Sequence, residues 1–220
     1  MLQFVSSNPN KASELEEILQ ISIQMKPLEL VEIQTDDLTE LVAHKARNAF
    51  RLSPSPLLVE DTSLYFEQWG NLPGPFIKWF LKSLTLEKLV ELLSHGENHK
   101  ARAVCILAFT FDGEKVHCFE GEVLGEIVAP RGNCGFGWDP IFQPIGSPKT
   151  FGEMTTTEKQ SFSMRERAAH AFKQSAIAQA VRNWHFHQQA STLSDYVEEL
   201  TYKALQRCFV RRLRELMPQQ

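Results

Sequence analysis

Two adjacent carboxylates in the stretch LLVEDTS are the first candidates for chemistry. Glu60 and Asp61 follow an apolar run that is typical of a buried strand. Neighbouring strand residues point to opposite faces, so one carboxylate could face a metal or a reacting water while the other braces the loop. The pair is expected at the carboxyl end of the strand, where open α/β sheets gather ligands. The alternative is a solvated turn in which Thr62 and Ser63 form local hydrogen bonds.

The N-terminal stretch FVSSNPNK predicts a turn that could bind an anion. Pro9 suits a first helical residue, because its missing N–H would have no helical partner there. The helix N-terminus then offers free backbone N–H groups and a positive dipole end. The side chains that could add donors are Ser6, Ser7, Asn8 and Lys11. The alternative is an ordinary strand-to-helix turn capped by Asn8.

Lys45 is predicted to leave its helix from an apolar face. It shares a helical stripe with Leu38, Val42 and Ala49. A lysine in that place either extends along the apolar surface to solvent or meets a negative partner such as a phosphate, and the sequence leaves both open.

A glycine-rich loop, GFGWDP, could form part of a base-binding pocket. Its glycines would let the backbone approach a ligand closely. Phe136 and Trp138 could stack on a base, and Asp139 could read a base edge. Core packing of the two aromatic rings is the alternative. Lys159 and Arg165 follow in a polar stretch and, taken singly, are solvated charges.

Alternating strands and helices must position these residues. Hydrophobic periods change repeatedly between strand-like and helix-like up to about residue 182, which predicts an α/β architecture. Asp112-Gly113 favours a tight turn between two β-rich segments, and Thr85 suits a helix N-cap. The expected strands are 2–5, 56–59, 102–111 and 115–128, and the expected helices include 9–19, 38–50 and 164–181.

The last segment of the chain has a different pattern. Residues 1–182 are expected to form the α/β domain, and residues 183–220 a helical C-terminal extension. Ser194 can cap a helix whose apolar residues recur at helical spacing, and arginines cluster late in it. We interpret this helix as one that packs on the domain or on another subunit.

Composition excludes several classes of protein. The 220 residues are 43% hydrophobic and 23% charged, which is the profile of a soluble globular protein. A net charge of -4 gives no general attraction to nucleic acid or to anionic membranes. No apolar run approaches the roughly 20 residues of a membrane span. The four cysteines are widely spaced, which fits a reducing, cytoplasmic setting without a zinc or redox pair.

Taken together, the motifs resemble the inosine triphosphate pyrophosphatase family over about residues 2–172. Their order and spacing carry the resemblance, and the IKWF and FGWDP motifs are closer in sequence to eukaryotic-type members. The matching parts are SSNPNK, VEIQ, HKARNAF, VEDTSLYFEQWGNLPGPFIKWFL, GEIVAPRGNCGFGWDPIF, KTFGEM, EKQ and SMR. The resemblance implies a long mixed sheet in an elongated two-lobed α/β fold, a homodimer, and a purine nucleoside triphosphate bound between the lobes.

The resemblance also implies roles for individual residues. Asp61 resembles the family's catalytic carboxylate, and Glu32 in VEIQ would ligate Mg2+ together with Asp61. Whether Glu60 also ligates the metal or only supports the loop stays open. Ser6, Asn8 and Lys11 would hold phosphates. Residues 136–139 would enclose the purine, with Lys159 and Arg165 completing that pocket. The full predicted substrate-binding set is Ser6, Ser7, Asn8, Lys11, Lys45, Thr62, Lys78, Phe136, Gly137, Trp138, Asp139, Lys159, Met164 and Arg165.

The implied reaction is hydrolysis of ITP, dITP or XTP to the monophosphate and pyrophosphate. Attack on the α phosphorus needs a hydroxide-like nucleophile, and the departing pyrophosphate needs its charge neutralised. Mg2+ could acidify a bound water, Asp61 could orient or deprotonate that water, and lysines could stabilise the leaving group.

The sequence departs from the family pattern in three places. Ser7 stands where the family usually has glycine, and the tail to Gln220 is longer than usual. Met164 stands where the family's Ser-His-Arg motif has histidine. Because methionine cannot form a comparable hydrogen bond, and apolar contacts discriminate weakly, we expect relaxed or altered base selectivity.

Three alternatives follow. A nucleotide-binding or interaction protein could keep the fold and lose turnover, although retention of Asp61, Glu32, Lys11 and Lys45 argues against it. A pyrophosphatase for modified pyrimidine triphosphates would share the general fold, but FGWDP resembles the purine branch. A nucleic-acid-binding module would need a basic face that the sequence lacks.

Overall fold

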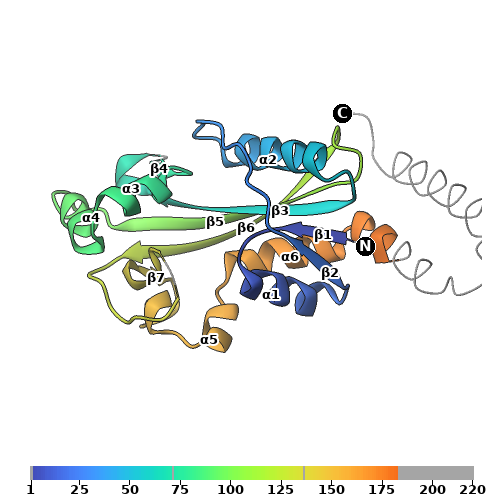
Figure 1. Cartoon of the computed structure of the whole chain (residues 1–220). Helices are drawn as coiled ribbons and strands as arrows, with labels where there is room; N and C mark the ends of the chain where they lie inside the picture. The colour runs from blue at the N-terminus through green and yellow to red at the C-terminus, as the bar shows by residue number, and fades with distance from the viewer. Residues whose placement is uncertain (1, 71, 136, 183–220) are drawn as a thin grey trace, which may run out of the picture.

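The structure is a computed structural model that describes residues 2–70, 72–135 and 137–182. Its fold is an elongated α/β arrangement around a seven-stranded mixed sheet (Figure 1), which confirms the predicted fold class. Phe136 and the predicted helical extension at 183–220 lie outside the described residues. Within the part described, no helix is both long and apolar enough to cross a bilayer.

Three long strands give the sheet its length. The spatial order is β2-β1-β3-β5-β6-β7, with β4 paired to β3. β1 is parallel to β2 and to the start of β3, and the other neighbours are antiparallel. The strands are β1 (Leu2–Val5), β2 (Ile23–Lys26), β3 (Leu57–Phe66), β4 (Pro73–Gly74), β5 (Lys100–Thr110), β6 (Val116–Ile127) and β7 (Phe142–Pro144).

The helices cover both faces of the sheet (Figure 1). Val42 of α2 shares one apolar cluster with Val59 and Ile106. Leu15 of α1 and Phe172 of α6 belong to the cluster on the opposite face. Each fully buried side chain of this size stabilises the fold by about 1.5–3 kcal/mol. The helices are α1 (Pro9–Leu19), α2 (Leu38–Leu52), α3 (Ile77–Ser83), α4 (Leu86–Leu93), α5 (Thr156–Gln160) and α6 (Met164–Gln174).

Local signals in the sequence set several of these boundaries. The β5–β6 pair is the predicted antiparallel hairpin, and Asp112 Oδ1 accepts bonds from the backbone N–H groups of Glu114 and Lys115 in its turn. Gly113 has a φ of 75°, which glycine adopts readily. Thr85 caps α4 as predicted, since its hydroxyl accepts from Lys88 N at 3.2 Å.

β3 is longer than predicted. Glu60 and Asp61 lie in the middle of the strand, because pairing with β5 continues as far as Phe66. Leu64 and Phe66 are fully buried, so apolar contacts hold the strand together beyond its polar residues. The predicted strand end and the solvated-turn alternative are therefore both wrong.

The helix predicted at 164–181 is interrupted. α6 ends at Gln174, and Ser175 has an extended backbone with a ψ of 154°. Residues 176–182 are helical again. The Ser175 hydroxyl accepts a bond from Ala178 N at 3.1 Å, which caps the second segment. A serine can take this capping role without any break in the hydrophobic period, so periodicity alone could not reveal the interruption.

Candidate active site

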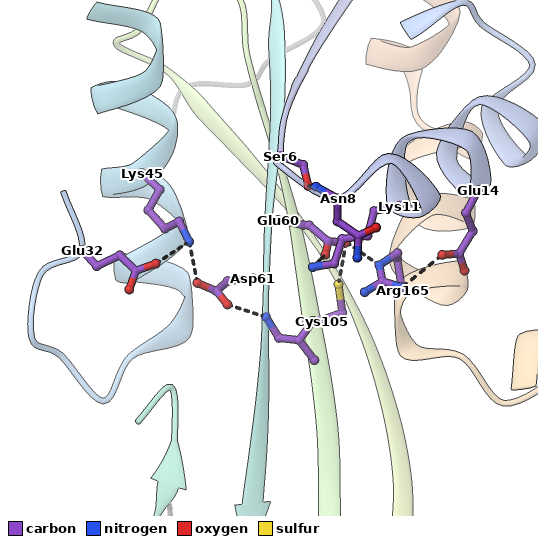
Figure 2. A network of polar contacts seen from close by, with 11 residues as sticks. Ser6, Asn8, Lys11, Glu14, Glu32, Lys45, Glu60, Asp61, Cys105 and Arg165 are labelled. Carbon is purple, nitrogen blue, oxygen red and sulfur yellow. Dashed lines mark hydrogen bonds and ion pairs between the residues drawn. The ribbon is translucent and has the colours of Figure 1, made fainter. Parts of the chain in front are cut away.

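The two adjacent carboxylates on β3 face opposite sides of the sheet. Figure 2 shows Asp61 on the side covered by α2 and Glu60 on the side covered by α1 and α6. This separation follows from strand geometry, since successive side chains alternate between faces. Each carboxylate belongs to its own network of ion pairs.

On the α2 face, one lysine bridges two carboxylates from distant segments. Lys45 Nζ lies 2.8 Å from Asp61 Oδ2 and 3.2 Å from Glu32 Oε1 (Figure 2). The second oxygen of Glu32 accepts a bond from Lys78 Nζ of α3 at 2.7 Å. Asp61 Oδ1 accepts a bond from Thr62 N at 2.8 Å, which fixes the carboxylate against its own strand. Glu32 and Asp61 therefore converge on a single ammonium.

The charges of this network stabilise one another. Burial lowers the pKa of Lys45, but the carboxylates of Asp61 and Glu32 outweigh it and hold that pKa above its usual value. Burial also raises the pKa of Glu32, whereas bonding to Lys78 and the charge of Lys45 lower it by more. The Lys45 ammonium and the Glu32 carboxylate are therefore both charged at neutral pH.

The loop between β2 and α2 carries Glu32 to this place. Val31 N donates to Asn48 Oδ1 of α2 at 3.1 Å, and Thr35 Oγ1 donates to Glu40 Oε2 at 2.6 Å. Asp37 caps α2, because its side chain accepts from two backbone N–H groups of the first turn. The loop is thus tied to α2 on both sides of Glu32.

The Glu32 and Asp61 pair is suited to Mg2+. Magnesium is usually held by one or two carboxylates, with waters and substrate phosphates completing its shell. Among residues 2–70, 72–135 and 137–182 there is no group of three or more His, Cys, Asp or Glu side chains that could hold a metal. A cation at this pair would therefore take its further ligands from water or substrate, and Lys45 now occupies the position between the two carboxylates.

On the opposite face, Glu60 binds two basic residues. One oxygen pairs with Lys11 Nζ at 2.5 Å, and the other accepts from Arg165 Nε at 2.6 Å. Arg165 Nη1 donates in turn to Glu14 Oε2 at 3.0 Å. The Glu60 side chain is only 2% exposed, and Cys105 Sγ lies 3.9 Å from it. The structure does not bring Glu60 to the Glu32 and Asp61 pair, so its assignment as a metal ligand stays a prediction.

Glu60 is held in its ionised form. Burial alone would raise its pKa, but the charges of Arg165 and Lys11 outweigh burial and lower that pKa to about 2. Burial, assisted by the negative charge of Glu60, raises the pKa of the Cys105 thiol well above its usual range. The thiol is therefore protonated and can donate to the carboxylate.

Acid is predicted to weaken the fold through Glu60. Because its pKa is depressed in the folded state, its stabilising contribution is complete above about pH 4.5 and is lost as the pH falls toward 2. Glu60→Gln should reduce the slope of unfolding free energy against pH in that window. It should also cost about 3 kcal/mol or more at pH 7, since Lys11 and Arg165 lose their shared partner.

Urea unfolding at a series of pH values, followed by circular dichroism, measures both effects. Glu120→Gln is the matched control at an exposed carboxylate on β6. Parallel curves for wild type and Glu60→Gln between pH 4.5 and 2 would contradict the prediction.

The turn after β1 has the predicted strand–turn–helix form. Ser6 N donates to Lys26 O at 3.1 Å, and Asn8 N donates to Ser6 Oγ at 3.1 Å. Ser7 is exposed, and α1 begins at Pro9. β1 pairs with β3 only as far as Leu58, which lies two residues before Glu60. The turn after β1 therefore begins close to the Glu60 position of β3. This geometry explains how Lys11, in the first turn of α1, reaches Glu60.

The glycine-rich loop forms a third cluster. Asp139 is nearly fully buried and accepts a bond from Lys159 Nζ of α5 at 2.6 Å. A side chain at Gly135 would place its Cβ 2.0 Å from Asp139 Oδ2, and Gly135 and Gly137 both have positive φ values. Trp138 is 6% exposed and packs edge-on against Phe142. The structure thus shows core packing for Trp138, and its place in a purine pocket stays a prediction.

Met164 also belongs to the core. It is the first residue of α6, directly after the N-cap Ser163, and is 3% exposed. Beside it, Gly121 of β6 allows close packing, because a Cβ there would lie 1.9 Å from Met164 O. The apolar side chain that replaces the family's histidine is thus accommodated by packing.

Sequence reasoning missed Glu14 as a member of the Glu60 network. A usable signal was present, because Lys11 and Glu14 are three residues apart on α1 and therefore share a helical face. No pattern in the sequence indicated that this face meets Arg165, which lies about 150 residues later. That contact depends on the packing of α1 against α6.

The fold and its two carboxylate–lysine networks define an α/β protein whose site suits a polyanion together with a divalent cation. A model of the Ham1 family matches residues 2–175, and the chain therefore belongs to the Ham1 family. This membership confirms the resemblance found in the motifs.

Named relatives agree with the family match. The inosine triphosphate pyrophosphatase of Podospora anserina is 44% identical over 170 residues, covering 76% of this chain and 89% of that protein. The inosine triphosphate pyrophosphatase of Candida glabrata is 38% identical over 182 residues, covering 78% and 95%. A HAM1 protein from Coxiella burnetii has a similar structure, with a TM-score of 0.71 at 28% identity, covering 79% of this chain and 97% of that one.

A second solved structure is the nucleoside-triphosphatase / dITP/XTP pyrophosphatase of Mycobacterium abscessus. Its TM-score is 0.65 at 26% identity, and the match covers 78% of this chain and 98% of that one. The matched part of this chain therefore corresponds to nearly the whole length of these relatives.

Proposed function

We propose that this protein hydrolyses aberrant purine nucleoside triphosphates, namely ITP, dITP and XTP, to the monophosphate and pyrophosphate, and so removes them from the nucleotide pool. The observation that carries the proposal is the convergence of Glu32 and Asp61 on one cation, the ammonium of Lys45. The relatives named inosine triphosphate pyrophosphatase support the same activity.

The proposed reaction assigns a task to each network. A water oxygen bonds to the α phosphorus, the bond from that phosphorus to the α–β bridging oxygen breaks, and pyrophosphate leaves. Asp61 accepts the proton of the attacking water, while Lys45 and Lys11 compensate the charge of the leaving pyrophosphate. Glu32 and Asp61 would hold Mg2+, which would supply further charge compensation and make an attacking water more acidic.

The proposal includes Mg2+ as the cofactor, a homodimer as the assembly and the cytoplasm as the compartment. The donor set supports Mg2+, because carboxylate oxygens suit this hard cation. Among the described residues, Cys105, Cys118 and Cys134 are free cysteines, which is consistent with a reducing compartment. The family resemblance supports the homodimer, which light scattering of the full chain would test.

A magnesium-dependent substrate panel tests the proposed activity. Pyrophosphate release from ITP, XTP, ATP, GTP and a pyrimidine triphosphate is measured with and without EDTA. We expect release from ITP and XTP that EDTA abolishes. Nucleotide binding without pyrophosphate release would overturn the proposal in favour of a nucleotide-binding protein. A preference for the pyrimidine triphosphate would instead indicate a pyrophosphatase that acts on modified pyrimidine triphosphates.

The same panel tests base selectivity. Because Met164 cannot hydrogen-bond a base, we propose that selectivity is relaxed, with kcat/KM for ITP exceeding that for ATP by less than about 100-fold. That bound reflects what apolar contacts achieve without a buried hydrogen bond. A preference for 6-oxo purines clearly above that bound would contradict the prediction.

A further inference from the structure

Glu32 stands in a segment without regular secondary structure. β2 ends at Lys26 and α2 begins at Leu38. The structure describes all of residues 27–37 between them, and these residues form neither helix nor strand. Figure 2 shows this segment beside α2, with Glu32 reaching toward Lys45. A carboxylate that binds a cation has to be held close to its final geometry, because ordering it on binding would weaken the affinity.

A side-chain amide on α2 holds the backbone directly beside Glu32. The N–H of Val31 donates to Asn48 Oδ1 at 3.1 Å. The side chain of Val31 is 62% exposed, so its packing does little to fix the backbone there. Leu30 and Ile33 are partly buried against the cluster beneath α2. Because apolar contacts are non-directional, they keep the segment near the helix without fixing one backbone position.

The same helix also holds the carboxylate of Glu32. Lys45 lies three residues before Asn48, and therefore beside it on α2, and pairs with Glu32 Oε1 at 3.2 Å. The helix is itself well placed, because Asp37 caps its first turn and Val42 is fully buried. If a divalent cation takes the place of the Lys45 ammonium, the backbone anchor at Asn48 still ties Glu32 to α2.

We infer that Asn48 is a positioning residue, which holds the backbone beside Glu32 and thereby keeps that carboxylate within reach of a divalent cation shared with Asp61. Without the anchor, Glu32 would spend part of its time away from Asp61. The apparent Kd of the cation would then rise by the inverse of the fraction of time that Glu32 is in place. This inference deepens the proposed function and rests on its assignment of Glu32 and Asp61.

Asn48→Leu removes the hydrogen-bond acceptor but keeps the size of the side chain. Leucine has the higher helix propensity, and the freed N–H of Val31 can bond to water because this contact is exposed. The fold should therefore be as stable as that of wild type. We expect the Kd of free Mn2+, used in place of Mg2+, to rise about three- to tenfold. Electron paramagnetic resonance of the full chain without nucleotide measures this Kd.

The turnover of ITP should show the same separation. The Mg2+ concentration that gives half the maximal rate should rise by a similar factor in Asn48→Leu. Because saturating Mg2+ restores Glu32 to its place, kcat at saturating Mg2+ should stay within about twofold of wild type. A purely structural loss would instead lower kcat through a smaller folded fraction.

Two further variants identify the hydrogen bond as the cause. Asn48→Asp keeps an oxygen that can accept from Val31 N, and it should bind Mn2+ at least as tightly as wild type. Asn98→Leu is the matched control between α4 and β5. It makes the same change at an amide whose Oδ1 also accepts a backbone bond, from Lys100 N at 3.0 Å. Its Mn2+ affinity should equal that of wild type.

Hydrogen exchange measures the anchor without any metal. Peptides that cover residues 27–37 should exchange faster in Asn48→Leu than in wild type, whereas peptides of the α2 core should not change. Thr35→Val tests the same segment if Asn48→Leu fails to fold. It removes the bond from Thr35 Oγ1 to Glu40 Oε2 at 2.6 Å, and should weaken Mn2+ binding in the same direction by a smaller factor.

Mn2+ binding by Asn48→Leu equal to that of wild type would overturn the inference. Equally weak binding by Asn48→Leu and Asn48→Asp would also overturn it, since the acceptor oxygen would then not matter. Pyrophosphate release from ITP by the wild-type chain tests the proposed function separately. A chain that binds Mn2+ through an anchored Glu32 but does not hydrolyse ITP would keep the inference and lose the proposed function.

Discussion

Asp61→Asn is expected to lower kcat for ITP hydrolysis about 10²- to 10⁴-fold. The substitution removes the proposed proton acceptor and one of the two carboxylates that converge on Lys45. Asparagine has the same size, and its amide oxygen can still accept the bond from Thr62 N, so the fold should persist. Pyrophosphate release at saturating ITP and Mg2+ measures the loss, and calorimetry with a non-hydrolysable ITP analogue shows whether binding survives.

The matched control for this variant is Asp36→Asn. Asp36 is an exposed carboxylate in the same β2–α2 loop region as Glu32, and its replacement should leave kcat within about twofold of wild type, as for most surface substitutions. If the Asp61→Asn enzyme retains more than about a third of the wild-type kcat, Asp61 is not the proton acceptor of the reaction.

Lys45→Met is expected to affect catalysis and metal binding in opposite directions. Loss of the ammonium should lower kcat/KM for ITP about 10²- to 10³-fold, as for other groups that stabilise developing charge. The same change leaves Glu32 and Asp61 without the cation that now lies between them. Free Mn2+, used in place of Mg2+, should therefore bind about tenfold more tightly or better. Methionine preserves the apolar stem on the α2 stripe.

Electron paramagnetic resonance of Mn2+ measures this affinity without nucleotide. Lys88→Met on α4 is the control, because it makes the same change at an exposed lysine that pairs with Glu91. Its Mn2+ affinity should equal that of wild type. Equal or weaker Mn2+ binding by Lys45→Met would mean that lysine and metal do not compete for the pair.

The sequence predicted the elements that local chemistry controls. The bounds of α1 agree with the expected helix 9–19, and the β5–β6 hairpin follows from its turn dipeptide. It did not predict the length of β3, because four polar residues in a row are typical of a strand end. Only pairing with β5 along the whole strand makes that stretch continuous.

The site was harder to predict, because its contacts cross large distances in the sequence. Lys45 was expected to extend to solvent or to meet a negative partner such as a phosphate, and the structure gives it Asp61 and Glu32. Glu32 lies in an irregular loop, so only the family resemblance pointed to it. That Glu60 and Asp61 face opposite sides follows from strand alternation, but the partners of Glu60 depend on how α1 and α6 pack.

Anomalous scattering from Mn2+ gives the most direct test of the central claim. The full chain would be crystallised with Mn2+ and a non-hydrolysable ITP analogue. We predict an anomalous peak about 2–2.5 Å from carboxylate oxygens of both Glu32 and Asp61, with Lys45 displaced toward the phosphates. A peak coordinated by Glu60 instead, or none between Glu32 and Asp61, would contradict the proposed site.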